Sequence, residues 1–251
     1  YLKYWFSAKT AHGIHSPFVF ELYNEAINKK GNYYSFDKIE LLRKKLLLSK
    51  KEIEVRDLGT GRSGKRTMGE IAERSAKNKK YCKLLFRLAY YFKPTTVLEL
   101  GTSLGISTAY LASANPNSKV ITIEGCPNTA QEAKKNFESL GLANIESLIG
   151  NFEDVLTTNI ERLASNGKLD FAFFDGNHKR EHTLKYFTQC LESTHNNSVF
   201  IFDDIHWSDE MEEAWEEIKS HPKVSVTIDL FFLGLVFFRK EQAKENFIIR
   251  Y

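Results

Sequence analysis

The sequence predicts a doubly wound, Rossmann-like α/β fold preceded by a mostly helical N-terminal extension. From Thr96 onward, short apolar runs of strand length alternate with stretches of helical periodicity. This alternation is typical of a parallel sheet whose strands are joined by right-handed helical crossovers. The last two apolar runs are joined by a short connection that contains Gly234. Because a crossover helix does not fit into it, we expect these two strands to be antiparallel to each other.

Five apolar runs predict the parallel part of the sheet, and two more runs follow them. The expected strands are residues 96–100, 119–124, 145–149, 169–175, 198–203, 224–230 and 235–238. The expected helices between and after the first five strands are residues 105–113, 128–140, 153–164, 179–192 and 208–220. Gly141 directly follows one of these helices, where glycine commonly ends a helix.

The N-terminal part of the chain favours helices. Ser16 followed by Pro17 predicts a helix start, because serine is a good N-cap and proline suits the first helical position. Thr67 and Glu70 have the spacing of a capping box, which predicts a second start. The expected helices are residues 16–28, 36–48, 67–76 and 81–92.

The net charge of +3 is divided unevenly along the chain. Residues 1–93 hold 21 Lys and Arg against 9 Asp and Glu, or +12, whereas residues 94–251 hold 14 against 23, or −9. With the change of pattern, this predicts a helical extension over residues 1–92 and an α/β domain over residues 93–251. The plain interpretation of the lysines is solvated helix faces. The alternative is a basic region that faces the acidic one or an anionic partner.

The composition is that of an ordinary globular protein, with 42% hydrophobic and 27% charged residues. The longest apolar runs have strand length, so we expect no membrane span and no membrane partner. The first residues lack the long apolar core of a signal peptide. Cys82, Cys126 and Cys190 have no metal-binding spacing, which favours free thiols and a cytoplasmic protein.

A glycine-rich turn joins the first strand of the predicted α/β domain to its first helix. The strand runs through Glu99 into Gly101, Gly105 closes the turn, and the helix follows at once. Glycines allow a ligand to approach the backbone closely, and a helix N-terminus offers N–H donors. The next strand ends in Glu124, where a doubly wound fold places a carboxylate for a ribose diol. These residues predict a nucleotide-type cofactor site; the alternative for Glu124 is a helix cap.

A second glycine cluster also resembles a nucleotide loop. Its segment Gly59–Lys65 has the glycine and lysine spacing of a P-loop, but Arg66 stands where Ser or Thr would bind magnesium. Residues 52–57 before it alternate between apolar and charged, whereas the strand before a P-loop is buried on both faces. We interpret the segment as a basic loop near the mouth of the active site, with a phosphate site as the alternative.

Carboxylates follow the fourth and fifth expected strands. Asp175 ends the fourth strand, and Asp203 and Asp204 end the fifth. The carboxyl ends of neighbouring parallel strands meet at the edge where ligands bind, so we expect the three side chains to converge. A divalent cation of the Mg²⁺ or Mn²⁺ type would offset their mutual repulsion. The alternative is that these acids cap helices and accept hydrogen bonds from backbone amides.

Two candidate bases follow Asp175. His178 lies three residues beyond it and is suited to accept a proton from a hydroxyl held on the metal. Lys179 is the competing base. His206 and Trp207, just past the acidic pair, are candidates to line a substrate pocket, although Trp207 is equally suited to the core.

Together these motifs resemble the class I S-adenosylmethionine-dependent methyltransferases. More narrowly, they resemble the metal-dependent O-methyltransferases that act on catechols and on macrolide sugars. The resemblance covers residues 80–240 approximately and implies a seven-stranded methyltransferase sheet. The cofactor-binding residues that it implies are Glu99, Gly101, Thr102, Ser103, Gly105, Ser107, Glu124, Gly125, Asn151, Phe152 and Asp175.

The resemblance also implies roles for the acidic cluster. Asp175, Asp203 and Asp204 fall on the family's three metal positions, where the catechol enzymes have Asn in place of Asp204. The spacing from Asp175 to His178 resembles the sugar methyltransferases, which use such a histidine as the base. The catechol enzymes have lysine there. The implied catalytic residues are therefore Asp175, His178 and Lys179.

We therefore expect an S-adenosylmethionine-dependent methyltransferase that methylates a hydroxyl oxygen of a small molecule with the help of a divalent cation. One alternative is an RNA methyltransferase whose basic N-terminal half tracks phosphates. Against it, the sequence lacks an Asn-Pro-Pro-aromatic motif and any RNA-binding module that we recognise. The other alternative is a nucleotide-binding protein that uses Gly59–Lys65. A homodimer is left open.

Overall fold

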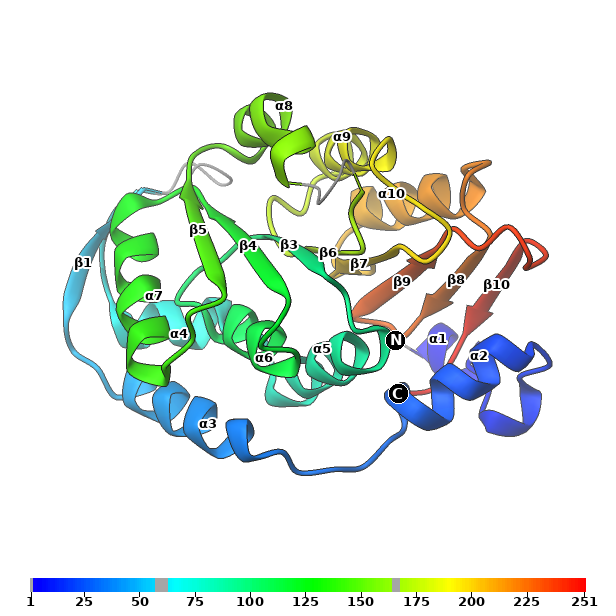
Figure 1. Ribbon diagram of the computed structural model, residues 1–251, viewed down its shortest axis with the longest axis horizontal. Helices are drawn as coiled ribbons and strands as arrows, with labels where there is room; N and C mark the ends of the chain where they lie inside the picture. Colours follow the sequence, from blue (N-terminus) through cyan, green and yellow to red (C-terminus); the bar gives the residue numbers. More distant parts are fainter. Residues whose placement is uncertain (1, 57–62, 164–167) are drawn as a thin grey trace. The chain divides into compact units, whose positions relative to one another are not determined.

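The structure, a computed structural model, describes residues 2–56, 63–163 and 168–251 (Figure 1). The chain divides into two packing units. The middle unit is Lys30–Thr158, and the terminal unit joins Tyr1–Lys29 to Asn159–Tyr251. The division into a helical extension over residues 1–92 and an α/β domain over residues 93–251 remains a prediction.

The middle unit contains three parallel strands, each followed by a helix. Strands β3 (Thr96–Leu100), β4 (Lys119–Glu124) and β5 (Ile145–Ile149) pair in this order. The helices that follow them are α6 (Ile106–Ala114), α7 (Pro127–Leu140) and α8 (Phe152–Leu163). The predicted alternation of strand and crossover helix is thus confirmed for this part of the chain.

Helix α6 lies at the core of the middle unit. Eight of its nine residues are buried, as expected for a helix that is covered on nearly all sides. Helices α3 (Tyr34–Leu47) and α5 (Lys79–Phe92) pack against it. Helix α4 (Met68–Ser75) has the predicted capping box, because Thr67 Oγ1 accepts from Glu70 N at 3.2 Å and Glu70 Oε2 accepts from Thr67 N at 2.8 Å.

A hairpin precedes α4. Strand β1 (Glu52–Val55) pairs antiparallel with β2 (Gly64–Thr67) in a separate two-stranded sheet. Residues 57–62 of the second glycine cluster lie outside the described residues, whereas Lys65 lies exposed on β2. A strand in a two-stranded hairpin lacks the doubly buried setting of the strand before a P-loop. The half-exposed strand that the alternation of residues 52–57 predicted is thus found, and the interpretation of Gly59–Lys65 as a basic loop stays a prediction.

The described part of the terminal unit contains five strands in the order β10-β8-β9-β7-β6. Strands β6 (Phe171–Phe174) and β7 (Val199–Asp203) are parallel. Strand β9 (Leu233–Phe237) is antiparallel both to β7 and to β8 (Val226–Asp229), which confirms the predicted antiparallel pair. Strand β10 (Glu245–Ile248), parallel to β8, adds a strand to the seven that were predicted.

The N-terminal residues pack on the C-terminal strands of the terminal unit. Helices α1 (Leu2–Ser7) and α2 (Pro17–Leu22) form here, and a π-helical turn continues α2 through Ile27. The Tyr4 hydroxyl donates to Ile249 O at 2.6 Å, and the rings of Phe18 and Phe237 meet edge to face with centroids 5.1 Å apart. The start predicted at Ser16 is confirmed, since its side chain accepts from Val19 N.

Helices α9 (Arg180–Leu191) and α10 (Asp209–Ser220) pack together in the same unit. Phe187 of α9 meets the rings of Phe200 and Phe202 on β7. Trp215 of α10 lies against β9 at Gly234, where an added Cβ would lie 2.7 Å from the indole ring. Gly234 is therefore required for close packing of helix and strand. No helix in the described ranges has the length and apolarity needed to cross a membrane.

A carboxylate is buried in the core of the middle unit. Glu99 on β3 has no exposed surface, and its Oε2 accepts hydrogen bonds from Thr108 and, at 2.7 Å, from Thr122. Within the described residues its Oε1 has no hydrogen-bond partner of normal geometry. Burial raises the pKa of Glu99 to about 7, although hydrogen bonds from Thr108, Ser107 and Thr122 act in the opposite direction. The folded protein therefore favours the protonated carboxyl.

We predict that Glu99 makes stability depend on pH. Because its folded pKa is raised above the unfolded value, its stabilising contribution is present below the unfolded pKa and is lost as the pH rises through about 7. The free energy of unfolding of the wild type, relative to Glu99→Gln, should fall by about 2–4 kcal/mol between about pH 4.5 and about pH 8. Urea denaturation followed by circular dichroism measures this difference. Exposed Glu138→Gln is the control, and a Glu99 difference that stays constant with pH would contradict the prediction.

Candidate active site

The turn between β3 and α6 has a backbone that L-residues rarely adopt. Gly101, Ser103 and Gly105 have φ angles of 104°, 45° and 81°. A Cβ at Gly105 would overlap the ring of Phe137, so glycine is needed for packing as well as for conformation. Gly101 N donates to Ile123 O at 3.0 Å, which fixes the turn to the neighbouring strand β4. The glycine turn predicted from the sequence is thus held in a fixed conformation that allows a ligand to approach its backbone closely.

Glu124, at the end of β4, is hydrogen-bonded to this turn. Its Oε2 accepts from Ser103 N at 2.8 Å, and its Oε1 accepts from Cys126 N at 2.9 Å. Cys126 is the N-cap residue of α7, so Glu124 also supports the start of that helix. A half-buried carboxylate can accept further hydrogen bonds, for example from hydroxyl groups. The structure thus brings together the two features that predicted a cofactor site.

The turn depends on three side chains that the sequence did not single out. Ser75, the last residue of α4, lies with its Oγ 2.5 Å from Ser103 Oγ. Asn136 on α7 donates from Nδ2 to Leu104 O at 3.0 Å. Thr122, a polar residue within the apolar strand β4, lies with its Oγ1 2.6 Å from that of Thr102. Only Thr122 carries a sequence signal, because a buried hydroxyl inside an apolar strand needs a partner.

The remaining predicted cofactor residues of the middle unit border the same strand ends. Gly150 N donates to Glu124 O at 3.0 Å, which brings the turn after β5 beside the end of β4. In that turn, Asn151 is exposed and its Oδ1 accepts from Glu153 N at 2.9 Å, and Phe152 is half-buried at the start of α8. Gly125 is half-buried and Ser107 is buried.

In the terminal unit, two of the three predicted metal carboxylates lie together. Asp175 follows β6 and Asp203 ends the parallel neighbour β7. Ligand atoms of Asp175, Asp203 and His178 all lie within 4.8 Å of one another. His178 Nε2 is 3.7 Å from Asp175 Oδ1. Two carboxylates and an imidazole form a donor set that suits a divalent cation.

Asp204 and Lys179 stand apart from this group. Asp204 is half-buried and has a φ of 51°, and its backbone N donates to Phe232 O at 2.7 Å. Its side chain is not among the grouped ligand atoms of the described residues. Lys179 is exposed and precedes α9. Asn177 and Phe231 also have positive φ angles, of 53° and 72°, and such strained backbone is typical of binding sites.

His206 anchors the segment that follows Asp204. Its Nε2 lies 2.8 Å from Asp229 Oδ2, its Nδ1 lies 3.0 Å from Glu212 Oε1, and its ring stacks on Phe231 with centroids 5.2 Å apart. Burial alone lowers the pKa of His206, but the hydrogen bonds and charges of Asp229 and Glu212 outweigh it and raise that pKa. Trp207, the next residue, is 72% exposed, so the alternative that it belongs to the core is wrong.

Comparison with known families supports the interpretation of these motifs. Residues 98–205 match a family model described as a methyltransferase domain. The chain is 30% identical over 125 residues to a catechol O-methyltransferase of Mycobacterium tuberculosis, covering 49% of this chain and 54% of that protein. It is 33% identical over 125 residues to a catechol O-methyltransferase of Niastella koreensis, covering 49% and 55%. The chain therefore spans about half the length of the relatives that it matches.

Solved structures with a similar fold extend the likeness over more of the chain. An O-methyltransferase from Bacillus cereus, in complex with S-adenosylhomocysteine, has a TM-score of 0.59 at 20% identity and covers 82% of this chain and 92% of its own. An O-methyltransferase from Streptomyces achromogenes, in complex with S-adenosylmethionine, has a TM-score of 0.60 at 19% identity and covers 88% and 95%. These likenesses show the mixed α/β fold of the methyltransferase type. The sequence similarity to a methyltransferase domain over residues 98–205 and to two catechol O-methyltransferases over about half of the chain agrees with this fold.

Proposed function

We propose that the protein transfers the methyl group of S-adenosylmethionine to a hydroxyl oxygen of a small molecule. The observation that carries this proposal is the bond between the glycine turn and the strand-end carboxylate. Ser103 N donates to Glu124 Oε2 at 2.8 Å. This bond holds the glycine turn, whose backbone a ligand can approach closely, beside a carboxylate that can bind hydroxyl groups. This combination suits the nucleoside part of the cofactor.

Different residues of the middle unit contact different parts of the cofactor in this proposal. Backbone N–H groups of the glycine turn and of the start of α6 face its polar tail, and Glu124 accepts hydrogen bonds from the ribose hydroxyls. Asn151 and Phe152 flank the adenine. The buried Glu99 supports the site indirectly, because its Oε2 accepts hydrogen bonds from Thr108 on α6 and Thr122 on β4 and so holds the elements on either side of the turn.

The cluster in the terminal unit fits a divalent cation. Asp175 and Asp203 would hold it, with Asp204 as a further ligand after a side-chain adjustment, and the ring of His178 lies close enough to both grouped acids to serve either as a third ligand or as the base. Such a cation, when bound, lowers the pKa of an acceptor hydroxyl and orients it. If the ring of His178 does not bind the metal, His178 is the proposed base that accepts the proton of the acceptor hydroxyl. If His178 is a ligand instead, Lys179 accepts the proton.

Aromatic side chains beside the cluster support a planar hydroxylated acceptor. Trp207 and Phe232 are 72% and 41% exposed, and Phe231 is held by the stacked ring of His206. Exposed aromatic faces bind flat ligands well, because they bury much area with little loss of conformational freedom. The catechol O-methyltransferases among the relatives make a catechol the first acceptor to test.

A turnover assay tests the proposed function. Purified protein is incubated with S-adenosylmethionine, Mg²⁺ and a series of catechols, other phenols and sugar hydroxyls. We expect a monomethylated product, identified by mass spectrometry, with formation of S-adenosylhomocysteine. Absence of methylation for every hydroxyl compound, with transfer to an RNA instead, would contradict the proposal.

We predict that Glu124→Ala weakens binding of S-adenosylhomocysteine by about 1–3 kcal/mol, because polar groups that the carboxylate serves lose their partner. Calorimetric titration measures the affinity. Glu138→Ala on the exposed face of α7 is the matched control and should bind like the wild type. Since Glu124 also bonds Ser103 N and Cys126 N, a thermal melt checks that each variant folds. An unchanged affinity in a folded Glu124→Ala protein would remove Glu124 from the site.

We predict that Asp175→Ala weakens binding of Mn²⁺ at least about 10–100-fold, the loss typical even of residues that only support a ligand. Electron paramagnetic resonance titration of free Mn²⁺ measures this without any turnover. Asp204→Asn should be milder, because an amide oxygen still ligates. Exposed Asp154→Ala is the control. The proposed metal site is wrong if the wild type binds no Mn²⁺ and its methyl transfer survives EDTA.

A further inference from the structure

Helix α3 of the middle unit presents an apolar stripe to solvent. Tyr34, Leu41 and Leu48 are 81%, 55% and 83% exposed. They are spaced by seven residues, so they lie along one face of the helix and its C-cap. No described part of the chain covers these side chains to any large extent. A row of large exposed apolar residues on one helix is typical of a surface that binds a partner.

Lysines border this stripe. Lys38, Lys44 and Lys45 are exposed, and Lys38 Nζ lies 4.8 Å from the centroid of the Tyr34 ring. Asp37 is the one acidic residue among the exposed positions of α3. We call the three apolar residues with these three lysines the α3 surface. It combines apolar contact with a strong local positive charge.

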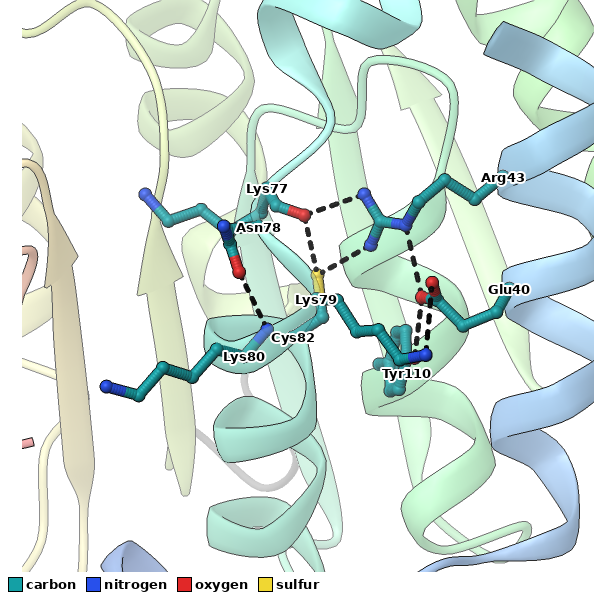
Figure 2. A network of polar contacts seen from close by, with 8 residues as sticks. All are labelled: Glu40, Arg43, Lys77, Asn78, Lys79, Lys80, Cys82 and Tyr110. Carbon is teal, nitrogen blue, oxygen red and sulfur yellow. Dashed lines mark hydrogen bonds and ion pairs between the residues drawn. The ribbon is translucent and has the colours of Figure 1, made fainter. Parts of the chain in front are cut away.

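The opposite face of α3 is fixed to its own unit, as Figure 2 shows. Arg43 Nη1 donates to Lys77 O at 2.7 Å, and Arg43 Nη2 lies 3.4 Å from Cys82 Sγ. Glu40 Oε1 accepts from Arg43 Nε at 3.1 Å and from the Tyr110 hydroxyl at 2.8 Å. Glu40 is thereby turned inward, and its negative charge is paired away from the α3 surface. The helix is held in one orientation with the lysines and the apolar stripe outward.

We propose that the α3 surface docks the protein on a membrane surface that contains anionic lipids. Lysines beside a row of Leu and Tyr are the pattern of a helix lying in the headgroup region, with the apolar side chains inserted and the ammonium groups at the phosphates. The complementarity of charge points to the anionic headgroups. The sequence predicts no membrane partner, because its longest apolar runs have strand length. The proposed contact differs from a membrane span, since the α3 surface would lie at the headgroups without crossing the bilayer.

Two other occupants fit the α3 surface less well. Pairing with the same helix of a second copy would bring Lys38, Lys44 and Lys45 against their own counterparts, and like charges repel. A nucleic acid would satisfy the lysines but would leave Leu41 and Leu48 against a hydrated phosphate backbone. Of these three occupants, the lipid surface is the one that accommodates both the apolar stripe and the lysines.

Co-sedimentation with vesicles tests the proposal. The full chain is mixed at low ionic strength with vesicles of phosphatidylcholine alone or of phosphatidylcholine and phosphatidylserine in equal amounts. We expect binding to the anionic vesicles only, weakened by salt. Each lysine near an anionic leaflet contributes about fivefold to binding, so Lys38→Glu/Lys44→Glu/Lys45→Glu should lose well over tenfold. Leu41→Ser/Leu48→Ser should also lose about tenfold or more, which separates insertion from charge attraction alone.

A matched control carries the same change of net charge away from α3. Lys134→Glu/Lys168→Glu/Lys240→Glu replaces three other exposed lysines and should bind nearly as the wild type does. Circular dichroism melts check that all three variants fold. The proposal is overturned if the wild type ignores anionic vesicles, or if the control loses as much binding as the α3 variants. It is also overturned if the α3 variants change only self-association, measured by sedimentation velocity, or only RNA binding.

Discussion

The buried carboxyl of Glu99 ties together the elements on which the cofactor site is built. It accepts hydrogen bonds from Thr108 on α6 and Thr122 on β4, so it joins three elements of the middle unit. Thr122 Oγ1 in turn lies 2.6 Å from Thr102 Oγ1 in the glycine turn. The cost of burying this group is kept low by protonation, at a pKa of about 7. The turn is thus held before any ligand arrives, which is what a pre-organised site requires.

The candidate metal cluster obeys a different constraint. Asp175 and Asp203 end neighbouring parallel strands of the terminal unit, so their carboxylates are held close by the register of the sheet rather than by mutual attraction. Beside them, His206 links Asp229 to Glu212 and stacks on Phe231, which fixes the loop after β7 without using the grouped ligands. Asp175 and Asp203 repel each other at fixed positions, and the loop after β7 is held in place independently of them. A site of this kind gains stability when it binds a cation.

Local patterns predicted the strands and the glycine turn, because apolar periodicity and positive φ angles are properties of short segments. Strand β10 escaped notice since only Phe247 among its four residues is buried. The packing of residues 1–29 with the C-terminal strands rests on contacts such as Tyr4 with Ile249, which no local pattern encodes. In the candidate site, strand-ending acids were visible, whereas Ser75 and Asn136 act through single hydrogen bonds and leave no motif.

The central claim is that the turn at Gly101–Gly105, with Glu124, binds the nucleoside of S-adenosylmethionine. Calorimetric titration of the wild-type chain with S-adenosylhomocysteine and, separately, with ATP tests it most directly. The account predicts saturable binding of S-adenosylhomocysteine at one site per chain and no binding of ATP. Saturable binding of ATP without binding of S-adenosylhomocysteine would contradict it, and would assign the nucleotide to the Gly59–Lys65 segment instead.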